Sequence, residues 1–233
     1  MRRGHSVEPD STKELTGLAL QGCLVAKDAT VNLRDFIENS SKMAMLAVSD
    51  CEKELDRMER RIDQEITSAI TQVSEDEARE LLACLKSIID LERIGDLTWS
   101  VTLRLQSLPT RLTKEDSRDL VAMSEVLEKM LDAIHEGFTR RNVEQAAWVL
   151  QNDSQIDHLC RAVFRRHLGS RDRQRRDYST SLLLMAQAFE RAGDHAKNLG
   201  EELFHLVEGR SVRHERKRPG KAGRAAAITA ADD

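Results

Sequence analysis

The chain carries one helical segment twice, and this repeat constrains the fold more than any other feature. Residues 81–108 and 181–209 both contain a Glu-Arg-x-Gly-Asp sequence between apolar residues. The alignment superimposes the acidic and glycine positions of the two copies: Glu92 on Glu190, Gly95 on Gly193 and Asp96 on Asp194. Two copies about a hundred residues apart predict two halves of similar structure.

Each copy places two carboxylates about one helical turn apart. Glu92 and Asp96, like Glu190 and Asp194, are separated by four residues, so both side chains project from the same side of a helix. A carboxylate next to a packing surface needs a partner, because burying an unpaired charge is very costly. The partner is either a metal ion that takes oxygen ligands or an arginine.

A glycine separates the two acids in both copies. Glycine inside a helix costs ~1 kcal/mol relative to alanine, so two glycines at the same repeat position need a reason. We expect Gly95 and Gly193 to permit the close approach of another helix or of a bound ion. One Glu-x-x-x-Asp pair alone is typical of a solvated helix surface, and the repetition is what favours a site.

The composition predicts an all-α protein. The 233 residues include only 3 prolines and 11 glycines, and 33% of the residues are charged. Leu, Ala, Glu and Arg are abundant, whereas Val, Ile and Thr form no alternating runs that would predict a sheet. The net charge of −4 argues against nucleic acid as the main partner of the folded part.

Six long helices are expected, three on each side of Pro109. Thr113 with Asp116 marks the start of the second half. The expected helices lie at about residues 12–38, 42–73, 74–108, 114–140, 143–167 and 177–207. Short connections between long helices make neighbouring helices antiparallel. The sequence therefore predicts two tandem three-helix bundles, residues 12–108 and residues 112–208.

The two ends of the chain lie outside the predicted bundles. Residues 1–11 and the basic segment 210–233 are expected to be disordered. The basic segment is either a solvated tail or an electrostatic arm for anionic lipid or an acidic partner. The N-terminus lacks the apolar core of a signal peptide, no apolar run approaches ~20 residues, and the cysteines have no Cys-x-x-Cys spacing. We therefore expect a cytoplasmic protein with only peripheral contact to a membrane.

The two motif copies resemble the repeated signature of the PhoU family of phosphate-transport regulators. The resemblance rests on residues 91–96 and 189–198 and extends over about residues 12–208. It also covers acidic positions on the middle helix of each half: Glu52, Asp56, Glu59 and Asp63 in the first, and Asp153 and Asp157 in the second. The resemblance implies two tandem three-helix bundles with the motif on the last helix of each.

The resemblance also implies metal binding at the acidic motifs. One oxygen-rich site is expected from Glu92 and Asp96 with Asp56 and Glu52, and the other from Glu190 and Asp194 with Asp153 and Asp157. Iron, zinc, manganese or magnesium ions suit such ligands. The alternative is a network of arginine–carboxylate pairs, because Arg93 and Arg191 lie inside the motifs.

The two copies differ after the second acid. The second copy continues with His195 and later Asn198, whereas the first continues with Leu97-Thr98-Trp99-Ser100. We therefore expect the first site to hold metal less well, or in a different way. His195 is either a further ligand or a solvated side chain.

The function implied by the resemblance is negative regulation of phosphate uptake and of phosphate-starvation signalling. Such a protein would contact the cytoplasmic subunit of a phosphate ABC transporter and a sensor histidine kinase. It would act by binding one of their states more tightly than another. A polar face on each bundle would suit a homodimer or two simultaneous partners. An adaptor for a different transporter or kinase is the alternative.

No catalytic residue and no organic cofactor site are expected. Di-iron carboxylate enzymes need two Glu-x-x-His pairs and two further glutamates, and only Glu202 with His205 fits that pattern, near a helix end. The sequence has no Ser/His/Asp pattern and no phosphate-binding P-loop. A di-iron enzyme in a helical bundle is therefore the less favoured alternative.

Overall fold

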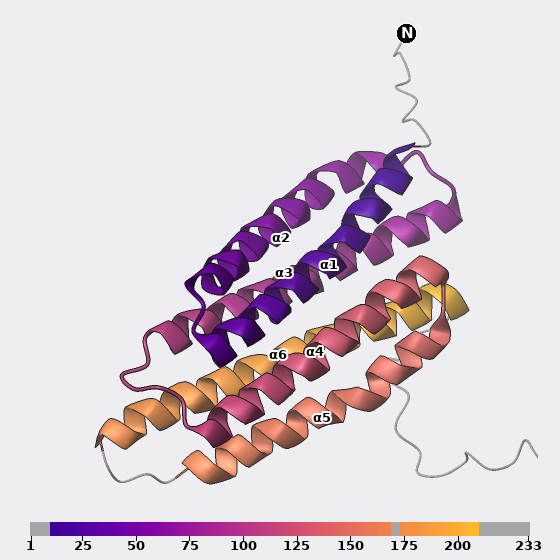
Figure 1. Cartoon of the computed structure of the whole chain (residues 1–233). Coiled ribbons are helices and arrows are strands. Elements are labelled where there is room, and N and C mark those ends of the chain that lie inside the picture. The colour runs from indigo at the N-terminus through magenta and orange to yellow at the C-terminus, as the bar shows by residue number, and fades with distance from the viewer. Residues whose placement is uncertain (1–9, 169–172, 210–233) are drawn as a thin grey trace, which may run out of the picture.

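The computed structural model describes residues 10–168 and 173–209, which form six helices and no strand (Figure 1). The helices are α1 (Asp10–Asn39), α2 (Lys42–Ala69), α3 (Glu75–Gln106), α4 (Lys114–Arg140), α5 (Val143–His167) and α6 (Arg173–Glu208). Their bounds agree with the predicted ones to within a few residues, and the all-α fold class is confirmed. Apart from the first two residues of α1, the segments predicted to be disordered lie outside the described residues.

The two ends of α4 illustrate why the helices begin and end where they do. Thr113 Oγ1 accepts a hydrogen bond from the backbone N–H of Asp116 at 3.1 Å, which satisfies an amide group that has no partner in a preceding turn. At the other end Arg141 adopts a left-handed backbone with φ 52°, and Asn142 then caps α5. The chain therefore reverses direction in two residues, and α5 packs against α4.

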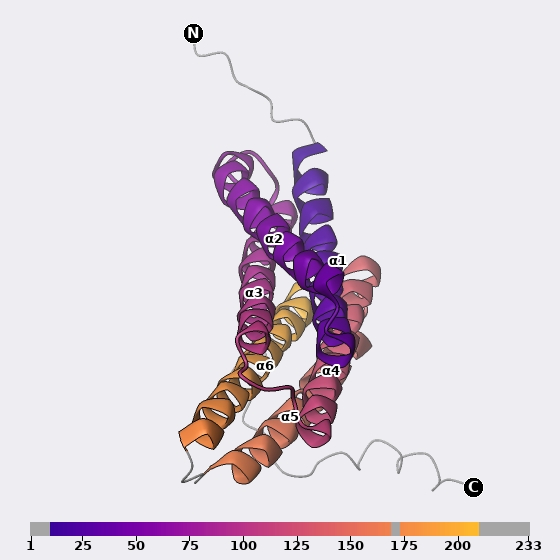
Figure 2. The same cartoon turned by 60° about the vertical axis from the view of Figure 1, so that its left-hand side comes forward.

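The predicted tandem bundles are present, and they share one core. Helices α1–α3 pack together, as do α4–α6, and the bundles meet where α1 packs on α4 and α3 packs on α6 (Figures 1 and 2). The fully buried side chains come from every helix: Leu33 of α1, Leu55 of α2, Leu91 of α3, Leu127 of α4, Ile156 of α5 and Phe189 of α6. Neither bundle is therefore an independent globule, because each covers an apolar face of the other.

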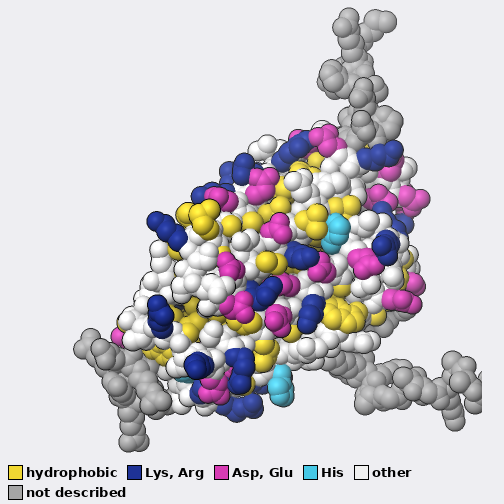
Figure 3. All heavy atoms as spheres, viewed as in Figure 1, with side chains coloured by type: hydrophobic (Ala, Val, Ile, Leu, Met, Phe, Trp, Pro, Cys, Tyr) yellow, Lys and Arg dark blue, Asp and Glu magenta, His cyan; other side chains and the backbone are white. Residues whose placement is uncertain are grey.

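Charged side chains cover the outside of the contact between the bundles. On the face seen in Figure 3, acidic and basic side chains are intermingled over α1 and α4. Lys27 Nζ lies 2.7 Å from Asp132 Oδ1, and Arg34 Nε donates to Glu128 Oε1 at 2.7 Å. These pairs fix the register of α1 on α4, although exposed ion pairs add little to stability.

The motif glycines lie where the middle helix approaches the motif helix of each bundle. A Cβ atom on Gly95 would lie 2.6 Å from Leu55 Cδ1 of α2, and one on Gly193 would lie 3.1 Å from Ile156 Cδ1 of α5. The predicted close approach of another helix is therefore confirmed. The contact brings the acids of α2 and α5 next to the acids of the motifs.

Replacing Gly95 with valine is expected to lower the free energy of unfolding by about 1–3 kcal/mol, because the new side chain would collide with the fully buried Leu55. Gly17 of α1 is the matched control, since a Cβ there has no atom within 4 Å. Gly17→Val should be neutral or slightly stabilising, because glycine is the poorer helix former. Urea unfolding of both variants checks this, and equal losses would contradict it.

Among the described residues, no helix combines the length and the apolar character that a membrane span needs.

Candidate metal centres

The first acidic cluster joins α2 to α3. Asp56 and Glu59 lie three residues apart on α2, Glu92 lies on α3, and one oxygen atom from each lies within 4.8 Å of the others. The close approach of the two helices at Gly95 makes this convergence possible. Three carboxylates in so small a space repel one another unless a cation or a proton intervenes.

Glu92 is the most buried member of this cluster. Its side chain is 13% exposed, and its Oε2 atom is buried and accepts no hydrogen bond from any described group. Burial raises the pKa of Glu92, and the negative charges of Asp96 and Glu59 raise it further. A buried oxygen without a hydrogen-bond donor is costly, so a cation that reached this oxygen would stabilise the carboxylate.

Arginines approach the first cluster from its solvent side. Arg60 binds Asp56 on the same helix, Arg93 Nη1 donates to Asp96 Oδ2 at 3.3 Å, and Arg93 Nε lies 3.5 Å from Glu92 Oε2. Both arginines are more than half exposed, at 61% and 51%. The arginine–carboxylate alternative is therefore partly realised: Arg93 forms an ion pair with Glu92 Oε2, although that atom accepts no hydrogen bond from a described group.

Only some of the predicted ligands of the first site lie close together. Asp56 and Glu92 converge as expected, and the third member is Glu59, which the sequence placed among the acidic positions of the middle helix but not among the ligands. Glu52 lies one turn earlier on α2, with its Cα next to Gly95. Asp96 is about half exposed and bound to Arg93.

The second cluster brings together the four acids predicted for it, on α5 and α6. Burial raises the pKa of Glu190, as do the charges of Asp157 and Asp194. Burial and the charges of Asp153 and Asp157 likewise raise the pKa of Asp194. Within the described residues, however, no three of these oxygens meet as closely as those of the first cluster.

A lysine already occupies part of the second cluster. Lys197 Nζ, one turn after Asp194 on α6, donates a hydrogen bond to Asp153 Oδ2 at 2.7 Å. The thiol of Cys160 lies nearby on α5; burial raises its pKa to about 11, and the charges of Glu190 and Asp157 contribute. Both clusters therefore join acids of a middle helix to acids of a motif helix, but they differ in their charged groups.

His195 is neither in the second cluster nor simply solvated. Its Nδ1 atom lies 2.7 Å from Asp90 Oδ1 of α3, and Asn198 Nδ2 donates to the same oxygen at 3.3 Å. These contacts join the two motif helices across the contact between the bundles. The histidine and asparagine that distinguish the second motif copy thus bind its partner helix.

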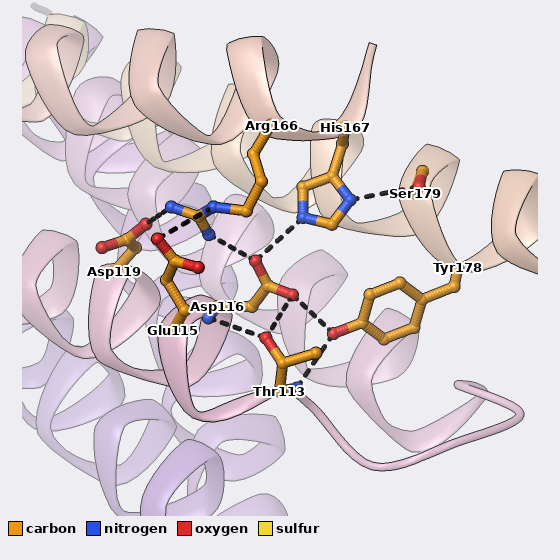
Figure 4. A network of polar contacts seen from close by, with 8 residues as sticks. All are labelled: Thr113, Glu115, Asp116, Asp119, Arg166, His167, Tyr178 and Ser179. Atoms are coloured by element: carbon orange, nitrogen blue, oxygen red, sulfur yellow. Dashed lines mark hydrogen bonds and ion pairs between the residues drawn. The ribbon is translucent and has the colours of Figure 1, made fainter. Parts of the chain in front are cut away.

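A further polar cluster, which we call the Asp116 network, was not predicted from the sequence (Figure 4). It consists of Thr113, Glu115, Asp116 and Asp119 of the α4 start, Arg166 and His167 of the α5 end, and Tyr178 and Ser179 of α6. Asp116 is almost completely buried at its centre. Only the Thr113–Asp116 capping pair left a signal in the sequence, because the other partners are distant along the chain.

Asp116 is satisfied on both oxygens. Arg166 Nη1 donates to Oδ1 at 2.5 Å, and His167 Nε2 lies 2.8 Å from the same atom. Tyr178 and Thr113 donate their hydroxyl hydrogens to Oδ2 at 2.8 Å and 2.7 Å. Burial raises the pKa of Asp116, but the hydrogen bonds from His167, Thr113, Tyr178 and Arg166 outweigh it and lower the pKa to about 2.

The network contains a serine, a histidine and an aspartate in line, but its form is that of a structural joint. His167 Nδ1 lies 3.1 Å from Ser179 Oγ, and Ser179 is buried. Asp116 is held by an arginine and two hydroxyl groups besides the histidine. These buried contacts fasten the ends of α4, α5 and α6 to one another.

Comparisons with known proteins agree with the repeat. A family model described as the PhoU domain matches residues 25–104 and 120–203, and each range contains one acidic motif. The phosphate-specific transport system accessory protein PhoU homolog of Pseudomonas putida is 29% identical over 204 residues, covering 84% of this chain and 78% of that protein. The homolog from Rhizobium meliloti is 27% identical over 221 residues, covering 93% of this chain and 90% of its own length.

Solved structures share the fold. The crystal structure of PhoU from Pseudomonas aeruginosa superimposes with a TM-score of 0.74 at 22% identity, covering 85% of this chain and 97% of that one. The phosphate transport system regulatory protein PhoU from Streptococcus pneumoniae gives a TM-score of 0.77 at 20% identity, covering 86% and 97%. At these identities the likeness supports the six-helix architecture.

Proposed function

The chain belongs to the PhoU domain family, and we propose that it is an accessory regulator of a phosphate transport system. The resemblance found in the sequence is thereby confirmed at the level of the family. Support for the function comes from relatives that are named as accessory proteins of phosphate-specific transport. The match extends over both repeats, so both acidic clusters belong to the shared part of the chain.

The observation that carries the metal-binding part of this proposal is the buried carboxylate of Glu92. Its Oε2 atom has no hydrogen-bond donor, and oxygens of Asp56 and Glu59 lie close by. These residues fit an oxygen-binding cation such as iron, zinc, manganese or magnesium, with Glu52 one turn before Asp56 and Asp96 one turn after Glu92. When bound, the ion would neutralise the carboxylates and link α2 to α3.

Regulation would proceed by contact with other proteins. We expect the cytoplasmic subunit of a phosphate ABC transporter and a sensor histidine kinase as partners, with a homodimer as the assembly. The protein would restrain uptake and starvation signalling by binding their inactive states more tightly than their active states. It would work in the cytoplasm and reach the membrane only through these partners.

The proposal includes no catalytic step. Glu202, the acid of the single Glu-x-x-His pair, accepts two hydrogen bonds from Lys86 Nζ at 3.1 Å, which ties α6 to α3. The Asp116 network holds helix ends together. The charged groups of Glu202 and of the Asp116 network therefore form contacts that hold helices together.

A deletion strain grown in ample phosphate tests the regulatory proposal. We expect high phosphate-starvation gene output and altered phosphate uptake, both restored by the wild-type gene. Unchanged uptake and output would exclude the phosphate assignment and leave an adaptor for another transporter or kinase, to be identified by pull-down.

Glu92→Gln tests the metal-binding part, because it keeps the shape of the side chain and removes its charge. Metal affinity should fall at least about tenfold, and the gene should restore regulation in the deletion strain only weakly. Glu75→Gln is the matched control, because Glu75 is an exposed acid in the first turn of the same helix. If both variants bind metal and complement like the wild type, the Glu92 cluster has no part in the function.

A further inference from the structure

The contacts of the motif glycines align the middle helices of the two bundles. Gly95 faces Leu55 and Gly193 faces Ile156, so these two apolar residues occupy the same place. The neighbouring positions then correspond as follows: Glu52 to Asp153, Asp56 to Asp157 and Glu59 to Cys160. The second cluster therefore has a thiol where the first has its third converging carboxylate.

The motif helices differ by a charge as well. Counting from the aligned Glu92 and Glu190, Lys197 stands where the first copy has Trp99. The second cluster has thus lost one carboxylate and gained one ammonium group relative to the first. The ammonium group supplies positive charge to the remaining acids, as a metal ion would, although it carries only one charge.

The geometry places that ammonium group inside the cluster. Lys197 Nζ lies 2.7 Å from Asp153 Oδ2, and the Asp153 side chain is only 11% exposed. Lys197 itself is 37% exposed, less than either arginine at the rim of the first cluster. A lysine side chain is positively charged at neutral pH, and this one donates its hydrogen bond to a carboxylate. Charge-assisted hydrogen bonds of this kind are strong, whereas the exposed arginine pairs are readily displaced.

We propose that Lys197 takes the place of a metal ion in the second acidic cluster, so that the wild-type chain loads metal only in the first. The inference rests on the metal binding proposed above and reverses the expectation that the first site is the weaker one. Its basis is the position of Nζ on Asp153 and the absence of a comparable donor on Glu92 Oε2 among the described residues. The second cluster then binds no metal ion, whichever metal the cell supplies.

Manganese binding to the purified full chain tests this. Mn²⁺ prefers oxygen ligands, and its bound fraction can be counted by electron paramagnetic resonance and elemental analysis after chelator treatment and desalting. We expect Glu92→Gln to weaken binding at least about tenfold and Glu190→Gln to leave it unchanged. Lys197→Met should create a second bound manganese per chain, which Glu190→Gln in the same chain removes.

Lys86→Met is the matched control for the lysine substitution. It removes an ammonium group from Glu202, a carboxylate that is 12% exposed and links α6 to α3 away from both clusters. It should add no manganese. Circular dichroism establishes that each variant is helical, and Glu190→Gln alone tests the proposal even if Lys197→Met does not fold.

Two results would overturn the proposal. One is a loss of manganese from wild-type protein on Glu190→Gln as large as the loss on Glu92→Gln. The other is a folded Lys197→Met variant that gains no manganese. If the wild type binds none at all, the metal part of the proposed function fails separately. Lys197→Met then still tests the inference, since a gain of bound manganese that depends on Glu190 would support the view that Lys197 keeps metal out of the second cluster.

Discussion

Replacing Asp116 with alanine is expected to lower the free energy of unfolding by about 3–5 kcal/mol, because it breaks a buried charge network by removing one partner. Arg166 and His167 would lose their shared acceptor, and the hydroxyl groups of Tyr178 and Thr113 would each lose one. The ends of three helices would be loosened together. Urea unfolding followed by circular dichroism measures the loss.

Asp132→Ala is the matched control for Asp116→Ala. Asp132 lies on the same helix and also has a cationic partner, Lys27 at 2.7 Å, but it is more than half exposed. We expect a loss of less than about 1 kcal/mol there. Similar losses for the two variants would mean that the Asp116 network adds nothing beyond an ordinary surface pair.

The same carboxylate should govern part of the response to acid. Its pKa is lowered from 3.8 to about 2 in the folded chain, so the folded state binds a proton less readily than the unfolded state. The contribution of Asp116 is therefore complete above pH 3.8 and is lost as the pH falls toward 2. Between these values the wild type should lose stability more steeply than Asp116→Ala, and parallel curves would contradict the assignment.

Replacing Phe189 with alanine is expected to cost about 3–5 kcal/mol, because it empties a fully buried position next to the second acidic cluster. Among the described residues Phe189 is the largest fully buried side chain, and the repeat aligns it with the equally buried Leu91. The cavity would open in the shared core, at the residue that precedes Glu190. Chemical denaturation at constant pH gives the loss.

Leu184→Ala supplies the comparison for Phe189→Ala. Leu184 belongs to the same helix but is partly exposed, so its truncation should cost less than about 1.5 kcal/mol. A small loss for Phe189→Ala would mean that neighbouring side chains collapse into the space, and the packing around the second cluster would then be looser than the structure indicates.

Local sequence signals located the helices well. Pro109, the Thr113–Asp116 capping pair and the apolar periodicity are all properties of short stretches, and the structure has its helices there. The internal repeat predicted the tandem bundles, because two copies of one motif imply two copies of the structure around it. The motif glycines likewise predict the close approach of a helix or an ion, because glycine inside a helix is costly, and a helix lies at both Gly95 and Gly193.

Contacts between distant residues left no such signal. Arg166 meets Asp116 across 50 residues and Tyr178 meets it across 62, so no periodicity or spacing connects them. Likewise, the position of Lys197 on Asp153 depends on how α6 rotates against α5, which the sequence does not state. Charge balance at a site is therefore decided by packing that only the folded chain reveals.

The shared core has a consequence for how the protein is made. Because α1 and α3 are covered by α4 and α6, the N-terminal bundle leaves the ribosome with an apolar flank still bare. That flank stays open until nearly the last helix has been synthesised, since α6 ends at Glu208. We expect nascent chains and truncated products to be clients of chaperones, and a gene split between the repeats to give two insoluble halves that become soluble when co-expressed.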